Sequence, residues 1–312
     1  MSFVIPGKYP SDTGSVKTTA KPASPWPIAG IRNPIEISHS EVQIFSNYIH
    51  ALCGINIDQG KAYLLETRLG KLLQREGCDS FTAFYHKVKR DPTKRLEKEI
   101  IDAITTNETH FFRDRSPFEL LKHKIIPEVI DNRSAKTPKG APVNIRIWSS
   151  ACATGQEVFS IAIVLRELLG MNDRFNIKLI GTDISNAAIK QASYGSYNKF
   201  EIERGLPPER LQRFFSNNGD SWRIKDEIRA MATFQRINLM EPFTGIGRFD
   251  IIFCRNVAIY FKFEDRAALF NKIANALEPD GYLIIGSTES LTGVCSRFIP
   301  KRHLKSIFYQ LR

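Results

Sequence analysis

The stretch "NIRIWSSACATGQEVFSIAIVLRELLG", residues 144–170, carries the pattern that decides the fold. A short apolar run predicts a buried strand, a turn of small residues follows, and a helix begins at Gly155. The same pattern returns in "NIKLIGTDIS" and "NAAIKQASYG", and later in "FDIIFCR", "EDRAALFNKIANAL", "GYLIIGS" and "SIFYQL". Strands that alternate with helices predict an α/β fold with a doubly wound, mostly parallel sheet.

The alternation is interrupted between about residues 197 and 232. There "PPERLQRFF" indicates a short helix, and "DSWRIKDEIRAMATFQRI" is compatible with short antiparallel strands. We interpret this region as a small antiparallel β insertion within an α/β domain that covers residues 106–312.

The residues before this domain differ from it in composition and in apolar periodicity. Residues 1–36 are rich in Pro, Ser, Thr and Lys and lack apolar periodicity, which predicts a flexible tail. Residues 37–105 show helical periodicity in four runs that are bounded by caps or breakers, which predicts a small all-α domain. Another amphipathic helix is expected over roughly residues 116–131.

The composition limits the class of protein. Of 312 residues, 42% are hydrophobic and 25% charged, which is ordinary for a globular protein, and no run approaches the roughly 20 apolar residues of a membrane span. The 5 cysteines lack CxxC spacing, so neither a disulfide framework nor a metal site is expected, and a cytoplasmic location fits best. A net charge of +11 favours an acidic partner without choosing its kind.

A basic stripe is predicted on the second helix of the all-α domain. Lys61, Arg68, Lys71 and Arg75 fall within roughly an 80° arc at about 100° per residue, beside a face of leucines. The stripe is either a solvated face or a docking surface for an acidic helix, and the pattern does not decide between them.

The residues that follow the predicted strands are candidates for ligand binding, because ligands of open α/β sheets lie beyond the carboxyl ends of the strands. The turn "SSACATGQE" has one glycine instead of the GxGxxG dinucleotide fingerprint, and its Glu157 either complements the helix dipole or meets a cationic ligand group. Asp183 either accepts hydrogen bonds from ribose hydroxyls or caps the next helix in competition with Ser185. The two acids together favour S-adenosylmethionine over NAD.

Two further segments carry polar residues in unusual surroundings. In "FCRNVAIYF", Arg255 and Asn256 follow an apolar strand, and Tyr260 is either a site residue or a core ring with its hydroxyl at the edge. The segment "TTNETHFFRD", residues 105–114, places polar residues around Phe111 and Phe112 between the two predicted domains. We expect it to form a lid that the two phenylalanines anchor in apolar surface.

Several of these motifs together resemble a known family. "ITTNETHFFRD", "WSSACATGQEVFSIA", "IGTDIS", "INLM", "FDIIFCRNVAIYF" and "GYLIIGSTESL" occur in the order found in the CheR-type chemotaxis receptor glutamate methyltransferases. The resemblance covers about residue 38 to the end. It implies a class I S-adenosylmethionine-dependent, Rossmann-like fold and transfer of a methyl group to glutamate carboxylates on the cytoplasmic helices of methyl-accepting chemoreceptors, with S-adenosylhomocysteine as the product.

The resemblance also implies roles for individual residues. Arg113 and Tyr260 match the positions that the family places beside the transferred methyl group, and the cofactor pocket would consist of Asn107, Thr109, Arg113, Glu157, Asp183, Asn238, Leu239, Arg255 and Asn256. Gln156 and Val158 depart from residues that are frequent in the family, with little expected effect. The insertion matches a β-subdomain that in some members grips a receptor C-terminal peptide, but its hairpin region, 217–232, is short for that role.

The implied reaction agrees with the residues that the chain lacks. Glutamate, with a reference pKa of about 4.3, is already ionised at neutral pH, so no general base is required and His110 need not be catalytic. Rival hypotheses are an RNA methyltransferase, for which no NPPY-like or DPPY-like motif is found, and a cofactor-binding sensor without turnover. We expect a monomer that binds no nucleic acid and does not insert into a membrane.

Overall fold

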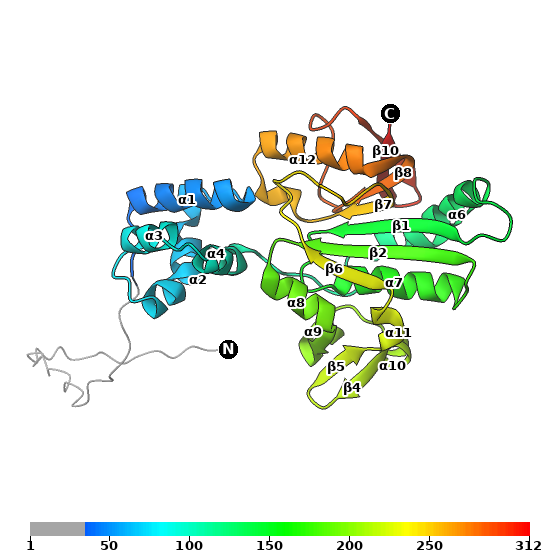
Figure 1. Cartoon of the computed structure of the whole chain (residues 1–312), viewed down its shortest axis with the longest axis horizontal. Helices are drawn as coiled ribbons and strands as arrows, with labels where there is room; N and C mark the ends of the chain where they lie inside the picture. Colours follow the sequence, from blue (N-terminus) through cyan, green and yellow to red (C-terminus); the bar gives the residue numbers. More distant parts are fainter. Residues whose placement is uncertain (1–34) are drawn as a thin grey trace, which may run out of the picture. The chain divides into compact units, whose positions relative to one another are not determined.

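A helical domain precedes the sheet in the computed structural model, which describes residues 35–312 (Figure 1). Its elements are α1 (His39–Cys53), η1 (Gln59–Lys61), α2 (Ala62–Arg75), α3 (Phe81–Lys89) and α4 (Arg95–Ile104). Ser38 begins α1 with a capping box, in which its side chain accepts from the backbone N–H of Glu41 and the Glu41 side chain accepts in return. The expected tail lies outside the described residues except for its last two positions.

The helical domain has its own core. The rings of Phe45, Phe81 and Phe84 are fully buried, and Leu65, Leu69 and Leu73 of α2 face the same cluster. The predicted apolar face of α2 is therefore confirmed.

The central sheet has seven strands in the order β6-β2-β1-β7-β8-β10-β9. They are β1 (Val143–Ser150), β2 (Phe175–Asp183), β6 (Ala232–Arg236), β7 (Phe249–Cys254), β8 (Leu277–Ile285), β9 (Phe298–His303) and β10 (Ser306–Leu311). Neighbours from β6 to β8 pair in parallel, while β10 pairs antiparallel with both β8 and β9. The predicted doubly wound, mostly parallel sheet is confirmed.

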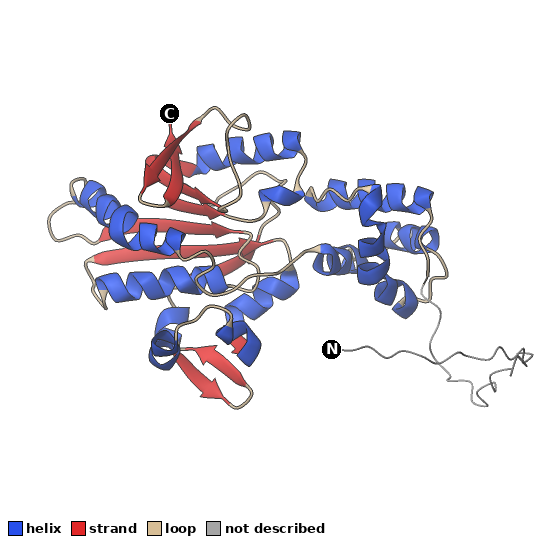
Figure 2. Cartoon of the chain, turned by 180° about the vertical axis from the view of Figure 1, so that it is seen from behind, coloured by secondary structure: helices blue, strands red, loops and turns tan. Residues whose placement is uncertain are grey.

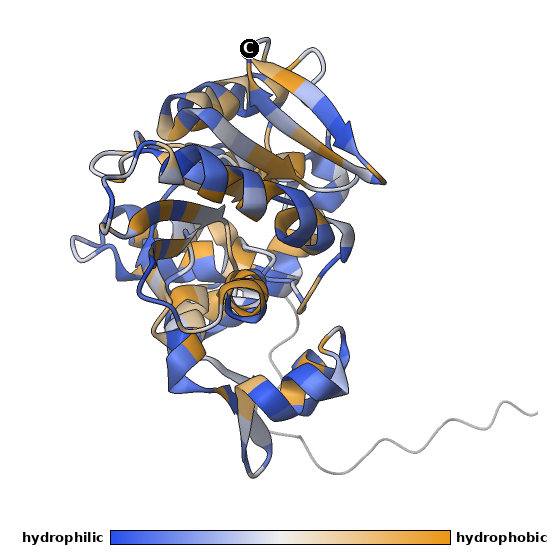
Figure 3. Cartoon of the chain, turned by 90° about the vertical axis from the view of Figure 1, so that its right-hand side faces the viewer, coloured by the Kyte–Doolittle hydropathy of each residue, from blue (hydrophilic) through white to orange (hydrophobic). Residues whose placement is uncertain are grey.

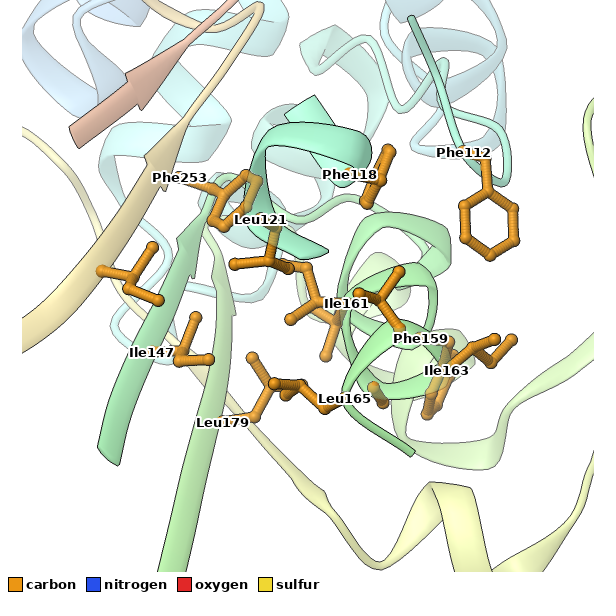
Figure 4. Close-up of a cluster of buried hydrophobic side chains, with 14 of the residues drawn as sticks. Phe112, Phe118, Leu121, Ile147, Phe159, Ile161, Ile163, Leu165, Leu179 and Phe253 are labelled. Carbon is orange, nitrogen blue, oxygen red and sulfur yellow. The ribbon is translucent and has the colours of Figure 1, made fainter. Parts of the chain in front are cut away.

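Helices cover both faces of this sheet (Figure 2). On β7, Ile251 and Phe253 join the core beneath α7 (Gln156–Leu169), whereas Ile252 and Cys254 join the core beneath α12 (Phe263–Ala276). Figure 4 shows that hydrophobic side chains of α7 and of the helix before β1 lie between these two helices and the sheet. Figure 3 shows the corresponding pattern in hydropathy, with hydrophilic and hydrophobic segments alternating along the helices. A strand buried on both faces explains why "FDIIFC" is apolar except for Asp250, whose carboxylate pairs with Arg133.

The helix expected over roughly residues 116–131 consists of three consecutive pieces. They are α5 (Ser116–Leu120), the π-helical turn η2 (Leu121–Ile125) and α6 (Ile126–Ser134). Pro127 has no N–H to donate to the preceding turn, and a wider turn before it keeps the helix continuous.

The inserted region follows α8 (Asn186–Tyr194) and contains a separate antiparallel sheet of three strands. Its strands are β3 (Ser196–Asn198), β4 (Phe215–Asn218) and β5 (Ser221–Ile224), with α9 (Lys199–Glu203), α10 (Pro208–Phe214) and α11 (Asp226–Arg229) around them. The prediction of short antiparallel strands within residues 220–237, with a hairpin region at 217–232, was partly wrong. The hairpin spans residues 215–224, and residues 232–236 form β6, which pairs in parallel with β2 in the main sheet.

Candidate functional site

A pocket of about 210 Å³ opens at the carboxyl ends of β1, β2 and β7. The order of the parallel strands reverses at β1, because β2 and β6 lie on one side of it and β7 and β8 on the other, and this arrangement leaves a crevice for a ligand. The predicted pocket residues all line it, namely Asn107, Thr109, Arg113, Glu157, Asp183, Asn238, Leu239, Arg255, Asn256 and Tyr260.

The turn between β1 and α7 forms one wall of the pocket. Ala151, Ala153 and Gly155 all adopt left-handed backbone conformations, with φ angles of 55°, 48° and 94°. A Cβ on Gly155 would lie 2.9 Å from the Cβ of Ala192 and 3.2 Å from the hydroxyl oxygen of Tyr197. Small residues are therefore required here both by the backbone conformation and by the space around it.

Asp183 ends β2 with a buried carboxylate. Its Oδ2 accepts from the backbone N–H of Ala153 at 2.9 Å, and its Oδ1 accepts from that of Ser185 at 2.9 Å. Ser185, rather than Asp183, caps α8 by accepting from the N–H of Ala188. Burial raises the pKa of Asp183 above its ordinary value, and no cation pairs with it in the described part of the chain.

Glu157 and Arg255 form a buried ion pair. Arg255 Nη1 donates to Glu157 Oε2 at 2.7 Å, and its Nη2 donates to Asp114 Oδ2 at 2.7 Å and to the carbonyl oxygen of Arg113 at 3.0 Å. The Arg255 side chain is 1% exposed, and the second oxygen of Glu157 accepts from the hydroxyl of Ser149. This network ties residues 113–114 to the first turn of α7.

The lid segment, residues 105–114, is anchored by its two phenylalanines, as predicted. The Phe111 ring meets the rings of Tyr197 and Phe215 edge to face, with centroids 5.0 and 5.4 Å apart. Phe112 is buried, and its backbone N–H donates to the hydroxyl of Ser160 at 2.9 Å. The first anchor is in the inserted region and the second is on α7.

The polar residues of the lid segment differ in their partners. Glu108 pairs with Arg204 of the inserted region at 2.8 Å, and Arg113 Nη1 donates to the Glu108 carbonyl oxygen at 3.1 Å. His110 has a buried Nδ1 without a hydrogen-bond partner, and burial lowers the pKa of this imidazole. Arg113 keeps further N–H donors on the side of the pocket.

The four residues of the predicted basic stripe on α2 differ in their partners. Arg68 donates to the carbonyl oxygen of Thr105 at 3.3 Å and to Thr106 Oγ1 at 3.1 Å, so it supports the lid segment and lines the pocket. Lys61 pairs with Asp58, Arg75 pairs with Glu76 and Glu99, and Lys71 is exposed. A helical wheel gives the direction of such side chains but not their partners, so these contacts were not predicted.

The helical domain completes the pocket. The backbone N–H of Asn56 donates to the carbonyl oxygen of Tyr260 at 2.9 Å, and Ile55 forms an antiparallel bridge with Phe261. Asn238 Nδ2 donates to the carbonyl oxygen of Leu52 at 2.9 Å. Tyr260 is 36% exposed, which rules out its interpretation as a core ring. No motif or periodicity had indicated that residues 55–57 line the site.

Glu289 is a supporting residue that sequence reasoning missed. Its Oε2 accepts from the backbone N–H groups of Asn256 at 2.8 Å and Gly286 at 2.7 Å, and Asn256 has a φ of 57°. The carboxylate therefore holds Asn256 in a left-handed conformation at the end of β7. Its position in the quoted motif "GYLIIGSTESL" was the available clue.

A doubly wound sheet with a pocket beyond the carboxyl ends of its strands is typical of folds that bind a nucleoside-containing ligand, and the family match identifies the class as S-adenosylmethionine-dependent methyltransferase. The chain belongs to the CheR methyltransferase family: the family models for the "SAM binding domain" and the "all-alpha domain" of CheR methyltransferases match residues 107–304 and 40–105. It is 35% identical over 272 residues to a chemotaxis protein methyltransferase, Cher2, of Pseudomonas putida, which covers 86% of this chain and 96% of the relative. It is 37% identical over 281 residues to a chemotaxis protein methyltransferase of Vibrio parahaemolyticus, with coverage of 89% and 99%.

Solved structures give a weaker likeness. A TehB-like SAM-dependent methyltransferase from Corynebacterium glutamicum is 16% identical with a TM-score of 0.33, and the match covers 59% of this chain and 86% of that one. Within residues 35–312, no three His, Cys, Asp or Glu side chains are grouped so that they could hold a metal ion. The helices of the same residues include none that is long and apolar enough to cross a membrane.

Proposed function

We propose that this protein transfers a methyl group from S-adenosylmethionine to glutamate side chains on the cytoplasmic helices of methyl-accepting chemoreceptors, forming methyl esters. The observation that carries the proposal is that Arg113 and Tyr260 line the same pocket as Asp183. A carboxylate acceptor and a nucleoside-containing methyl donor would then meet within one enclosed site.

The residues present fit S-adenosylmethionine. Asp183 uses one lone pair on each carboxylate oxygen for a backbone N–H, so each oxygen can still accept from a ribose hydroxyl. Residues 149–157 contain no Lys or Arg that would hold a pyrophosphate. Because Glu157 is already paired with Arg255, Asp183 is the better candidate of the two acids for binding the ribose hydroxyls. The side chains that would hold the cofactor are those of Asn107, Thr109, Arg113, Glu157, Asp183, Asn238, Leu239, Arg255 and Asn256.

The bound cofactor supplies a methyl group on a positively charged sulfur, and the chain must supply alignment of the acceptor. An ionised glutamate needs no general base. Arg113 retains N–H donors and Tyr260 presents a hydroxyl, so both can hold the acceptor carboxylate by hydrogen bonds. Positioning of this kind can lower a barrier by roughly 7–11 kcal/mol. A complete neutralisation of the acceptor would make it a poorer nucleophile, so Arg113 is assigned to orientation.

The test is methylation of receptor-containing membranes with labelled cofactor, followed by release of the label in base, as expected of a methyl ester. Arg113→Ala and Tyr260→Phe should each lower turnover, by about 10²-fold for a misplaced acceptor. Arg115→Ala and Tyr194→Phe are matched controls, because both residues are exposed and neither lines the pocket. Unchanged turnover in both site variants would remove the assignment, and label on added RNA would support a different acceptor class.

A further inference from the structure

Bulky apolar side chains lie exposed beside Tyr260. Ile259 is 55% exposed and Phe263 is 50% exposed, while their neighbours Ala258 and Phe261 are buried. Single exposed apolar residues are common on proteins, but here they flank a residue of the pocket wall. We name Ile259, Tyr260 and Phe263 the apolar shelf.

The apolar shelf stands on a rigid support. η3 (Ala258–Tyr260) is fastened to the helical domain by the Asn56 N–H and by the bridge between Ile55 and Phe261, and α12 begins at Phe263. His50 of α1 lies 2.7 Å from Asp265 in the first turn of α12, and the views agree that the ends of α1 and α12 are neighbours (Figures 1 and 2). The exposure of the shelf therefore belongs to a built surface rather than to a loose loop.

We propose that the apolar shelf binds the apolar side of the helix that carries the acceptor glutamate, an inference that rests on the proposed function. An acceptor held at Tyr260 brings its own helix against Ile259 and Phe263. Residues three or four positions from the acceptor lie on the same helix face, about 5–6 Å away. One of them would meet the shelf, so the preferred substrate is an amphipathic helix with an apolar residue one turn from the glutamate.

The charges on the α2 side of the pocket suit the proposed acceptor helix. Lys61 lines the same pocket as Tyr260, and Lys71 lies exposed on the same side of α2. A helix with an acidic residue and an apolar neighbour one turn away matches a site with cations on one wall and apolar side chains on another. A second copy of this chain is the alternative occupant that the experiment must separate.

The experiment compares Ile259→Ser and Phe263→Ser with Ile307→Ser and Phe200→Ser. The controls change the same residue types at exposures of 57% and 68%, away from the pocket. With a receptor cytoplasmic fragment as substrate, the shelf variants should raise KM about tenfold, as expected for lost burial of one large apolar side chain. Their kcat and their affinity for S-adenosylmethionine should stay within about twofold of the parent, and the controls should match the parent.

The substrate side gives an independent check. In the receptor fragment, serine in place of the apolar residue one turn from the acceptor should raise KM for the parent enzyme. With the Phe263→Ser enzyme, the same change in the substrate should raise KM only a little further. Parental KM values in both shelf variants, or a changed oligomeric state in sedimentation, would overturn the proposal. A parent enzyme that leaves receptor fragments unmethylated would instead overturn the proposed function.

Discussion

Arg255→Met is expected to destabilise the protein strongly, because it removes the cation from a buried pair and leaves the anions behind. Arg255 is 1% exposed, Glu157 is 13% exposed and Asp114 is 32% exposed at their side chains. Asp114 can regain water, so most of the cost should come from Glu157, whose remaining partner is the hydroxyl of Ser149.

The magnitude follows from this difference in burial. Removing one partner of a buried ion pair typically costs about 3–5 kcal/mol, whereas loss of a half-exposed pair costs about 0–1 kcal/mol. Arg255→Met should therefore lower the free energy of unfolding by about 3–5 kcal/mol, and Asp114→Asn by under about 1 kcal/mol. Adding Glu157→Gln to Arg255→Met should recover part of the loss, because the unpaired charge is then gone.

Urea denaturation of the single and double variants measures these values, and cofactor binding to the folded variants gives a second readout. Arg255 also holds the carbonyl oxygen of Arg113, so its loss should weaken cofactor affinity by loosening the lid segment. Two results would show that the buried pair does not organise the pocket. One is that Arg255→Met lowers the free energy of unfolding no more than Asp114→Asn does. The other is that the changes in this free energy caused by Arg255→Met and Glu157→Gln simply add in the double variant.

Two further predictions concern charge elsewhere in the chain. The Arg133 guanidinium lowers the pKa of Asp280 from 3.8 to about 2, so this pair stabilises the fold above pH 3.8 and loses its effect as the pH falls through about 2. Asp280→Asn should flatten the pH dependence of the unfolding free energy in that window, and an unaltered curve would exclude the pair as its source. Lys71→Glu should raise KM for receptor fragments without affecting cofactor affinity, whereas Lys139→Glu, an exposed control, should change neither. Equal effects of the two lysine variants would contradict docking on α2.

The strands that were predicted correctly are those with apolar runs long enough to be recognised. β7 is buried along its whole length, and its sequence is apolar almost throughout. β6 and β9 were not recognised as strands of the main sheet, because they lie at its two edges and bury few residues: none in β6 and only Phe298 in β9. Pro300 in β9 is typical of an edge strand, where one missing N–H is tolerated.

The candidate site was predictable for a related reason. Residues that follow parallel strands meet at one edge of the sheet, so Asp183 and Arg255 had to lie near each other whatever the loops did. Their partners were not predictable, because these depend on distant segments. Arg255 lines the pocket as expected, but its bonds to Glu157 and Asp114 were not foreseen. Arg68 was expected on a solvated face or a docking surface, and it supports the lid segment.

The pocket wall built from the helical domain has a consequence for synthesis of the protein. The pocket requires Asn56 near the start of the described chain and Tyr260 far along it, and Asn256 is held by Glu289. A chain emerging from the ribosome completes its helical domain early, but cannot assemble the pocket until β8 and the residues after it have appeared. During synthesis, cofactor binding therefore cannot assist folding of the helical domain. A truncated chain that ends before Glu289 would carry every residue that lines the pocket, but without the carboxylate that holds Asn256.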